Sequence, residues 1–130
     1  MAYVLTQREE ELCRIIVDCA YKVHLALGPG LLEKIYEACF CHELGKRIVA
    51  FKRQIKLGIN YDDLVFDEGL VLDVLVADLI ICEFKAVDNV NPIWQAQLLS
   101  HLKLTKLHVG FVLNFNVPIM KNGIRRYCRE

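Results

Sequence analysis

The chain carries no excess of charge of either sign, because 16 lysine and arginine residues balance 16 aspartate and glutamate residues. A strongly basic domain attracts nucleic acid through its overall field, so any phosphate-binding surface here has to be local. The sequence also lacks an uncharged run of membrane-spanning length, and charges at Arg8, Glu9, Glu10, Glu11 and Arg14 exclude a signal-peptide apolar region near its start. We therefore expect a cytoplasmic protein with no membrane partner.

Repeats, low-complexity tracts and linkers are absent as well. With 130 residues, 55% of them hydrophobic, the chain predicts a single compact domain over residues 1–130. Cys39, Cys41 and His42 lie close together, but no second ligand pair follows at zinc-finger spacing. We interpret the six cysteines as reduced thiols that serve as small core residues.

Helical and strand-like patterns are distinct along the chain. Thr6 and Glu9 form a potential capping box before a helix that continues to Leu27, where Gly28-Pro29-Gly30 ends it. The other predicted elements are a helix over 31–44, strands over 46–59, 70–76, 79–86 and 108–114, a turn at 60–63, a helix from Asn91-Pro92 (as cap and first helical position) to about 104, and a short edge strand over 123–128. This order predicts an α/β fold in which helices pack against a mixed sheet.

Three charged residues interrupt two apolar strands that are adjacent in the chain. Asp73 lies on the first, and Glu83 and Lys85 lie on the second. If the connection is centred on Asp78, Asp73 lies opposite Glu83, and Lys85 points to the same face one pleat further on. A two-residue turn between Ala77 and Asp78 would instead send Glu83 to the other face, so convergence requires an odd-length loop or a bulge.

Converging carboxylates at Asp73 and Glu83 suit Mg²⁺, which binds through one or two carboxylates together with waters and substrate phosphates. A lysine at position 85 can orient a water and offset charge that develops on a phosphate. The alternative is a buried network of ion pairs without chemistry, because such networks also contain perturbed charges.

Two further pairs each lie one helical turn apart. Glu33 and Tyr36 share a face of the second helix, although a carboxylate in a first turn is also favoured by the helix dipole alone. Gln97 and His101 can face the same cleft as Glu83, although such a pair is more often a solvated face or a local hydrogen bond.

The run Gly30-Leu31-Leu32-Glu33-Lys34-Ile35-Tyr36 resembles the signature of the GxxExxY protein family. The surrounding motifs agree in content and order: Val23-His24, Leu27-Gly28-Pro29-Gly30, Gln97-Leu98-Leu99-Ser100, Val109-Gly110-Phe111 and Asn114-Phe115. The likeness covers nearly the whole chain. That family resembles the PD-(D/E)xK nuclease-like superfamily, so the resemblance implies a restriction-endonuclease-like core with a mixed four-stranded sheet flanked by helices.

The resemblance also implies roles for individual residues. Asp73, Glu83 and Lys85 match the catalytic motif, with Asp73 and Glu83 as metal ligands and Glu33 as the helix glutamate that joins the metal site. Gln97 matches the glutamine of a Q-x-x-x-Y element that contacts substrate, and His101 stands where tyrosine is usual.

These matches predict a nuclease dependent on Mg²⁺ or Mn²⁺ that hydrolyses phosphodiester bonds in DNA or RNA. A non-catalytic module of the same fold that binds nucleic acid or protein is the alternative, favoured by the neutral charge and small size of the chain. A homo-oligomer or another protein partner stays open.

Overall fold

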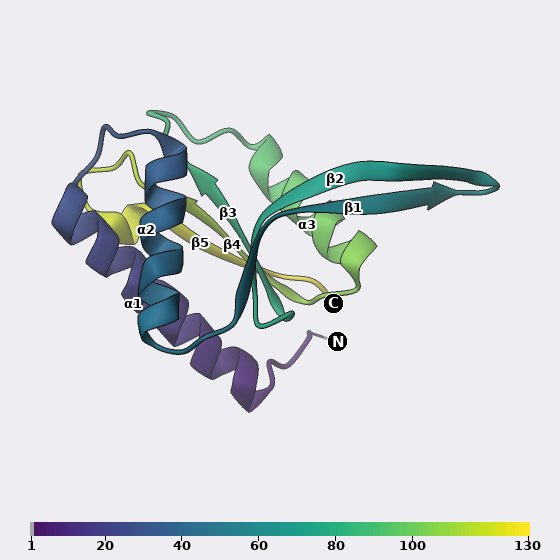
Figure 1. The fold of residues 1–130 in the computed structure, drawn as a ribbon, viewed down its shortest axis with the longest axis horizontal. Coiled ribbons are helices and arrows are strands. Elements are labelled where there is room, and N and C mark those ends of the chain that lie inside the picture. Colours follow the sequence, from purple (N-terminus) through teal and green to yellow (C-terminus); the bar gives the residue numbers. More distant parts are fainter. Residues whose placement is uncertain (1) are drawn as a thin grey trace.

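The computed structural model describes residues 2–130, in which five strands form one sheet in the order β1-β2-β3-β4-β5 (Figure 1). Neighbouring strands are antiparallel except β3 and β4, which are parallel and joined through α3. The elements are α1 (Gln7–Leu27), α2 (Glu33–Lys46), β1 (Phe51–Tyr61), β2 (Leu64–Val76), β3 (Ile80–Lys85), α3 (Ile93–Thr105), β4 (Val109–Asn114), η1 (Met120–Gly123) and β5 (Ile124–Cys128). The expected α/β fold is confirmed. The sheet has five strands where the resemblance implies four, because β5, which confirms the edge strand expected over 123–128, pairs with β4.

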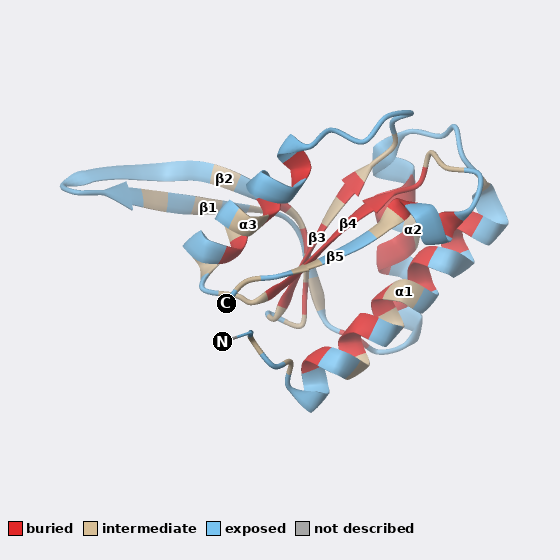
Figure 2. Ribbon diagram, turned by 180° about the vertical axis from the view of Figure 1, so that it is seen from behind, coloured by how far each residue is buried: buried red, intermediate tan, exposed pale blue. Residues whose placement is uncertain are grey.

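Helices cover both faces of the sheet, which explains why β3 and β4 are apolar throughout. Cys82 and Phe84 point toward the core beneath α1 and α2, whereas Ile81 and Val112 point toward a second core beneath α3. Figure 2 shows both strands as buried over most of their length. Polar side chains on β3 are therefore exceptions that need partners.

The first helix begins as the sequence predicts. Thr6 Oγ1 accepts a hydrogen bond from the Glu9 backbone N–H at 3.1 Å, and Glu9 Oε1 accepts one from the Thr6 N–H at 2.8 Å. This reciprocal pair satisfies two of the donors that a helix start leaves free. None of the helices within residues 2–130 has the length and apolar character needed to cross a membrane.

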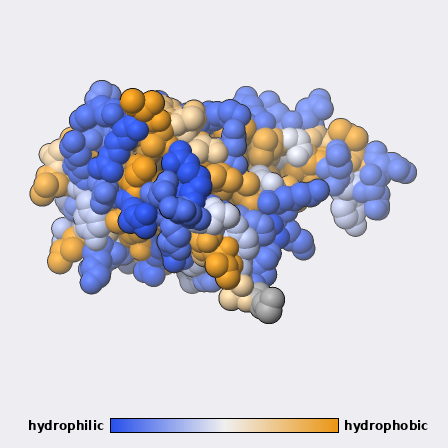
Figure 3. Space-filling model, turned by 90° about the horizontal axis from the view of Figure 1, so that it is seen from below, coloured by the Kyte–Doolittle hydropathy of each residue, from blue (hydrophilic) through white to orange (hydrophobic). Residues whose placement is uncertain are grey.

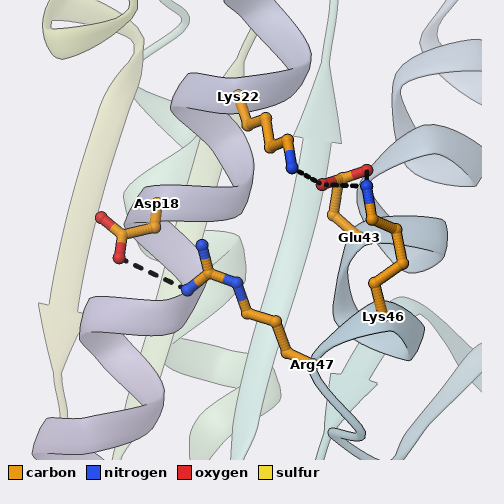
Figure 4. Close-up of polar contacts among 5 residues, drawn as sticks. All are labelled: Asp18, Lys22, Glu43, Lys46 and Arg47. Carbon is orange, nitrogen blue, oxygen red and sulfur yellow. Dashed lines mark hydrogen bonds and ion pairs between the residues drawn. The ribbon is translucent and has the colours of Figure 1, made fainter.

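Charged side chains join α1 to α2 along their exposed sides (Figure 4). Lys22 Nζ lies 3.1 Å from Glu43 Oε1, and Lys46 contacts the other oxygen of the same carboxylate at 3.2 Å. Arg47 reaches Asp18 at 3.4 Å. Because surface ion pairs contribute little free energy, the apolar core that α1 and α2 share is what holds the two helices together.

The second strand of the β1–β2 hairpin is longer than the sequence predicts, and the hairpin projects as an arm beyond the body of the molecule (Figure 1). β1 begins at Phe51 rather than at position 46, because α2 continues to Lys46 and Ile48 then takes a positive φ of 57°. β2 begins at Leu64 rather than at position 70, and only residues 62–63 form the turn. Residues 64–69 were not predicted as strand because their apolar side chains are contiguous instead of alternating with polar ones.

Candidate active site

The candidate site lies where β2 and β3 separate. Their ladder runs from Val76 opposite Ile80 to Val74 opposite Cys82, around a three-residue loop centred on Asp78. Ala77 and Asp78 both take positive φ values, 51° and 56°, which closes this odd-length loop. Continuing the register one step places Asp73 opposite Glu83, so the alternative two-residue turn is wrong.

Asp73 replaces the backbone pairing that would have continued the ladder. Its Oδ2 accepts a hydrogen bond from the Phe84 backbone N–H at 2.8 Å, and its Oδ1 lies 3.5 Å from Gln54 Nε2. The β3 backbone thus holds this carboxylate at the fork between the strands. A carboxylate fixed by a backbone donor is pre-positioned for binding and loses little side-chain freedom when a ligand arrives.

Glu83 is the most perturbed acid of the site. Its side chain is 13% exposed, and within residues 2–130 its Oε1 has no hydrogen-bond partner. His101 Nδ1 lies 3.6 Å from this oxygen, which is too far for a hydrogen bond, and is itself unpartnered. Burial, reinforced by the charge of Asp73, raises the pKa of the Glu83 carboxyl to about 7, while His101 opposes the shift. A buried oxygen without a partner is a site where an additional donor or cation is favoured.

Lys85 shares a face with Glu83, as its parity on β3 predicts. Its Nζ lies 5.7 Å from the centroid of the Trp94 ring, within the range of a cation–π contact. A small pocket of about 120 Å³ opens between β3 and α3 and is lined by Glu83, Lys85, Trp94, Gln97, Leu98, His101 and Val112. The structure therefore places both proposed substrate contacts of α3 beside the charged residues of β3.

The helix that carries Gln97 and His101 begins one residue later than the sequence predicts. Pro92 precedes the first residue of α3, Ile93, instead of occupying the first helical position. Asn91 nevertheless caps the helix start, because its Oδ1 accepts a hydrogen bond from the Ile93 N–H at 3.0 Å.

Glu33 lies at the rim rather than inside the site. It is exposed in the first turn of α2, and its pKa is raised by partial burial and by the charge of Asp73, with Lys85 acting in the opposite direction. No group of three or more Asp, Glu, His or Cys side chains among residues 2–130 is close enough together to hold a metal ion. The structure thus pairs Asp73 with Glu83 and leaves Glu33 outside that pair.

Asp73 and Glu83 fit a hard divalent cation of the Mg²⁺ type. Such an ion takes oxygen ligands, needs only one or two carboxylates, and keeps several waters. The unpartnered Glu83 Oε1 and the mutual repulsion that raises the pKa of this carboxyl are both relieved by a cation between the two groups.

Comparison with known proteins agrees with this arrangement. A family model described as the PD-(D/E)XK nuclease superfamily matches residues 10–127, which include every residue of the candidate site. The chain belongs to this superfamily. The match supports a nuclease acting on nucleic acid, and the mixed sheet flanked by helices is consistent with a restriction-endonuclease-like fold. No curated protein and no solved structure matches the chain.

Two features of this PD-(D/E)XK domain were not recognised from the sequence. The first is Glu37, a buried carboxylate that accepts hydrogen bonds from Arg53 Nε at 3.1 Å and Gln54 Nε2 at 2.7 Å. Gln54 lies opposite Asp73 with a positive φ of 49°, and its amide joins the two carboxylates. The only sequence signal was the position of Glu37 one turn after Glu33, on the same helix face.

The second feature is the pair of hydrogen bonds that the Tyr36 hydroxyl makes to the loop before α2. Its hydroxyl donates to the Gly28 carbonyl at 2.6 Å and accepts from the Leu31 N–H at 3.0 Å, while its ring stacks on Phe115. Gly30 has a φ of 98°, which a residue with a side chain rarely adopts. Tyr36 therefore anchors the loop that starts α2 and sets where Glu33 lies.

Proposed function

We propose that residues 1–130 form one nuclease domain of the GxxExxY type, which hydrolyses phosphodiester bonds in DNA or RNA with Mg²⁺ or Mn²⁺ as cofactor. The observation that carries the proposal is the juxtaposition of Asp73 and Glu83 across the strand fork, with one buried Glu83 oxygen unpartnered. Because all six cysteines are free thiols, we place the reaction in the cytoplasm, where thiols stay reduced.

Asp73 and Glu83 would hold the divalent ion. When bound, such an ion supplies Lewis-acid stabilisation of the phosphate and lowers the pKa of a bound water. Lys85 lies on the same face, where its ammonium group would offset the negative charge that develops on the phosphate oxygens or orient the attacking water. Glu33, at the rim, would complete the metal shell.

Gln97 and His101 provide the substrate contacts in this proposal. Both line the pocket opposite Glu83, so an amide N–H and an imidazole N–H are available to non-bridging phosphate oxygens. His101 stands where the family motif usually has tyrosine, so it would offer a ring N–H donor from the same position on α3. Their role is to hold the phosphodiester against the β3 charges.

The proposal is tested on a panel of labelled single- and double-stranded DNA and RNA, incubated with chelator, Mg²⁺ or Mn²⁺. We expect cleavage only with metal, and a loss of about 100-fold or more in turnover for Asp73→Asn and for Lys85→Ala. Asp78→Asn is the matched control, since it removes an exposed carboxylate at the closed end of the same strand pair and should keep full activity.

Metal affinity separates the two roles. Calorimetric titration should show Mg²⁺ binding lost in Asp73→Asn and retained in Lys85→Ala, because the latter keeps both carboxylates. Full turnover in Lys85→Ala would show that this lysine is structural and that the catalytic roles are assigned wrongly.

One observation favours the second candidate, a non-catalytic module that binds nucleic acid. Within residues 2–130, Asp73 and Glu83 are the two carboxylates that face each other at the β2–β3 fork. No third Asp, Glu, His or Cys side chain lies close enough to complete a metal site with them. Salt-sensitive binding of the panel with no cleavage under any metal would support this module over the enzyme.

A further inference from the structure

The projecting β1–β2 hairpin has one apolar face, and within residues 2–130 its outer part is left uncovered. Cross-strand pairs on this face are Ile55 with Leu72, Leu57 with Leu70, Ile59 with Phe66, and Tyr61 with Leu64. The pairs near the base pack against α3, but Tyr61, Leu64 and Phe66 at the tip are 68%, 57% and 49% exposed. Figure 3 shows hydrophobic side chains along this arm, bordered by hydrophilic ones.

The base of the same face opens into an apolar pocket of about 370 Å³. Leu57, Leu70, Leu72, Leu75, Leu104 and Leu107 contribute its hydrophobic lining. Leu104, on the last turn of α3, is 53% exposed. Apolar side chains at the tip and an apolar pocket at the base thus lie on one continuous strip of surface.

The two ends of the strip carry opposite charges. Asp62 and Asp63 form the turn at the tip, whereas Lys103 and Lys106 lie at the end of α3, adjacent in sequence to residues that line the pocket. None of these four residues makes an ion pair with another residue of the described range 2–130. Asp78, the charged residue in the pocket lining itself, is paired with Lys52. Negative charge at one end and positive charge at the other make the strip complementary to itself.

We propose that this strip is the interface with a second copy of the chain. In a two-fold arrangement the arms lie antiparallel, so that the tip of each copy covers the pocket of the other and each acidic turn meets the two lysines. Two sheets then pack face to face, which shields an arm that would be marginal as an isolated two-stranded hairpin. The acidic tip repels nucleic acid, so a protein surface is the occupant that the charges favour.

The bend of the arm is built for close packing of this face. The register shifts between Leu57 and Ile59, and the Ile59 side chain occupies the space that a Cβ on Gly69 would need. Only glycine at position 69 allows Ile59 to lie flat against the strands.

Sedimentation equilibrium of the full chain over a concentration series tests the proposal. We expect a monomer–dimer equilibrium, at least tenfold weaker in Leu64→Asp, which places a charge on the apolar face. Val65→Asp is the matched control, since Val65 is 71% exposed and points to the opposite face of the same strand, and it should leave the dimer intact. A wild type that stays monomeric at its solubility limit, or equal weakening by both variants, overturns the proposal.

A charge exchange keeps the test decisive if Leu64→Asp disturbs the arm. Asp63→Lys and Lys103→Glu each remove the attraction between tip and pocket, while Asp62 and Lys106, with positive φ values of 52° and 61°, stay unaltered. Each variant alone should dimerise at least tenfold more weakly, and an equimolar mixture should recover wild-type affinity as a heterodimer. No recovery on mixing would overturn the proposed pairing of tip and pocket between two copies. Neither result depends on nuclease activity.

Discussion

At the scale of single residues, the raised pKa of Glu83 predicts how folding stability depends on pH. Its pKa is raised to about 7, mainly by burial, so without metal the folded protein binds a proton there that the unfolded chain releases near its ordinary value of 4.5. Folding stability therefore falls as pH rises from about 4.5 to about 7, and the loss is complete above that range. Glu83→Gln removes the titration.

In chelator, urea unfolding should give similar stabilities for wild type and Glu83→Gln near pH 5. Near pH 8 the variant should be more stable, by up to roughly 3 kcal/mol. Glu43→Gln serves as control: Lys22 lowers the pKa of the Glu43 carboxyl, so this group is ionised at both pH values and its substitution should cost the same at each. A Glu83→Gln difference independent of pH would contradict the assigned environment.

At the scale of elements, the turn that enters α2 is held by one hydroxyl. Tyr36→Phe keeps the ring and its stacking on Phe115 but leaves the Gly28 carbonyl and the Leu31 N–H without a partner. We expect a loss of about 1–3 kcal/mol in the free energy of unfolding, measured in urea. Activity should fall as well, because Glu33 follows this turn directly.

A different tyrosine provides the comparison for that variant. Tyr21 lies on α1 and is 40% exposed, so Tyr21→Phe should change neither stability nor activity. If the two substitutions behave alike, the Tyr36 hydroxyl does not anchor the turn.

Elements whose pattern is local could be predicted from the sequence, and those set by pairing could not. The capping box at Thr6 and the parity of Asp73, Glu83 and Lys85 follow from spacing alone. The contact of Gln54 with Asp73 depends on the register of β1 against β2 and on a positive φ at a non-glycine residue, neither of which the composition of β1 reveals. The outer part of β2, residues 64–69, was missed because its apolar residues are contiguous instead of alternating with polar ones.

At the scale of the whole molecule, the candidate site couples metal binding to folding. Two carboxylates held together at the fork repel each other in the folded state, and this repulsion is weaker in the unfolded chain. A cation that binds only the folded state adds a free energy set by its concentration relative to its dissociation constant, about 2.7 kcal/mol at a hundredfold excess. Mg²⁺ or Mn²⁺ should therefore raise the melting temperature by several degrees.

That rise should vanish in Asp73→Asn and persist in Asp78→Asn, with Na⁺ at equal ionic strength as the control for screening. It should also be smaller below about pH 7, because the ion must then displace the proton that Glu83 holds. Differential scanning fluorimetry over a grid of pH and metal concentration measures both dependences together. A melting temperature that metal does not change would remove the metal from the mechanism, and an equal rise in Asp73→Asn would place the ion elsewhere on the molecule.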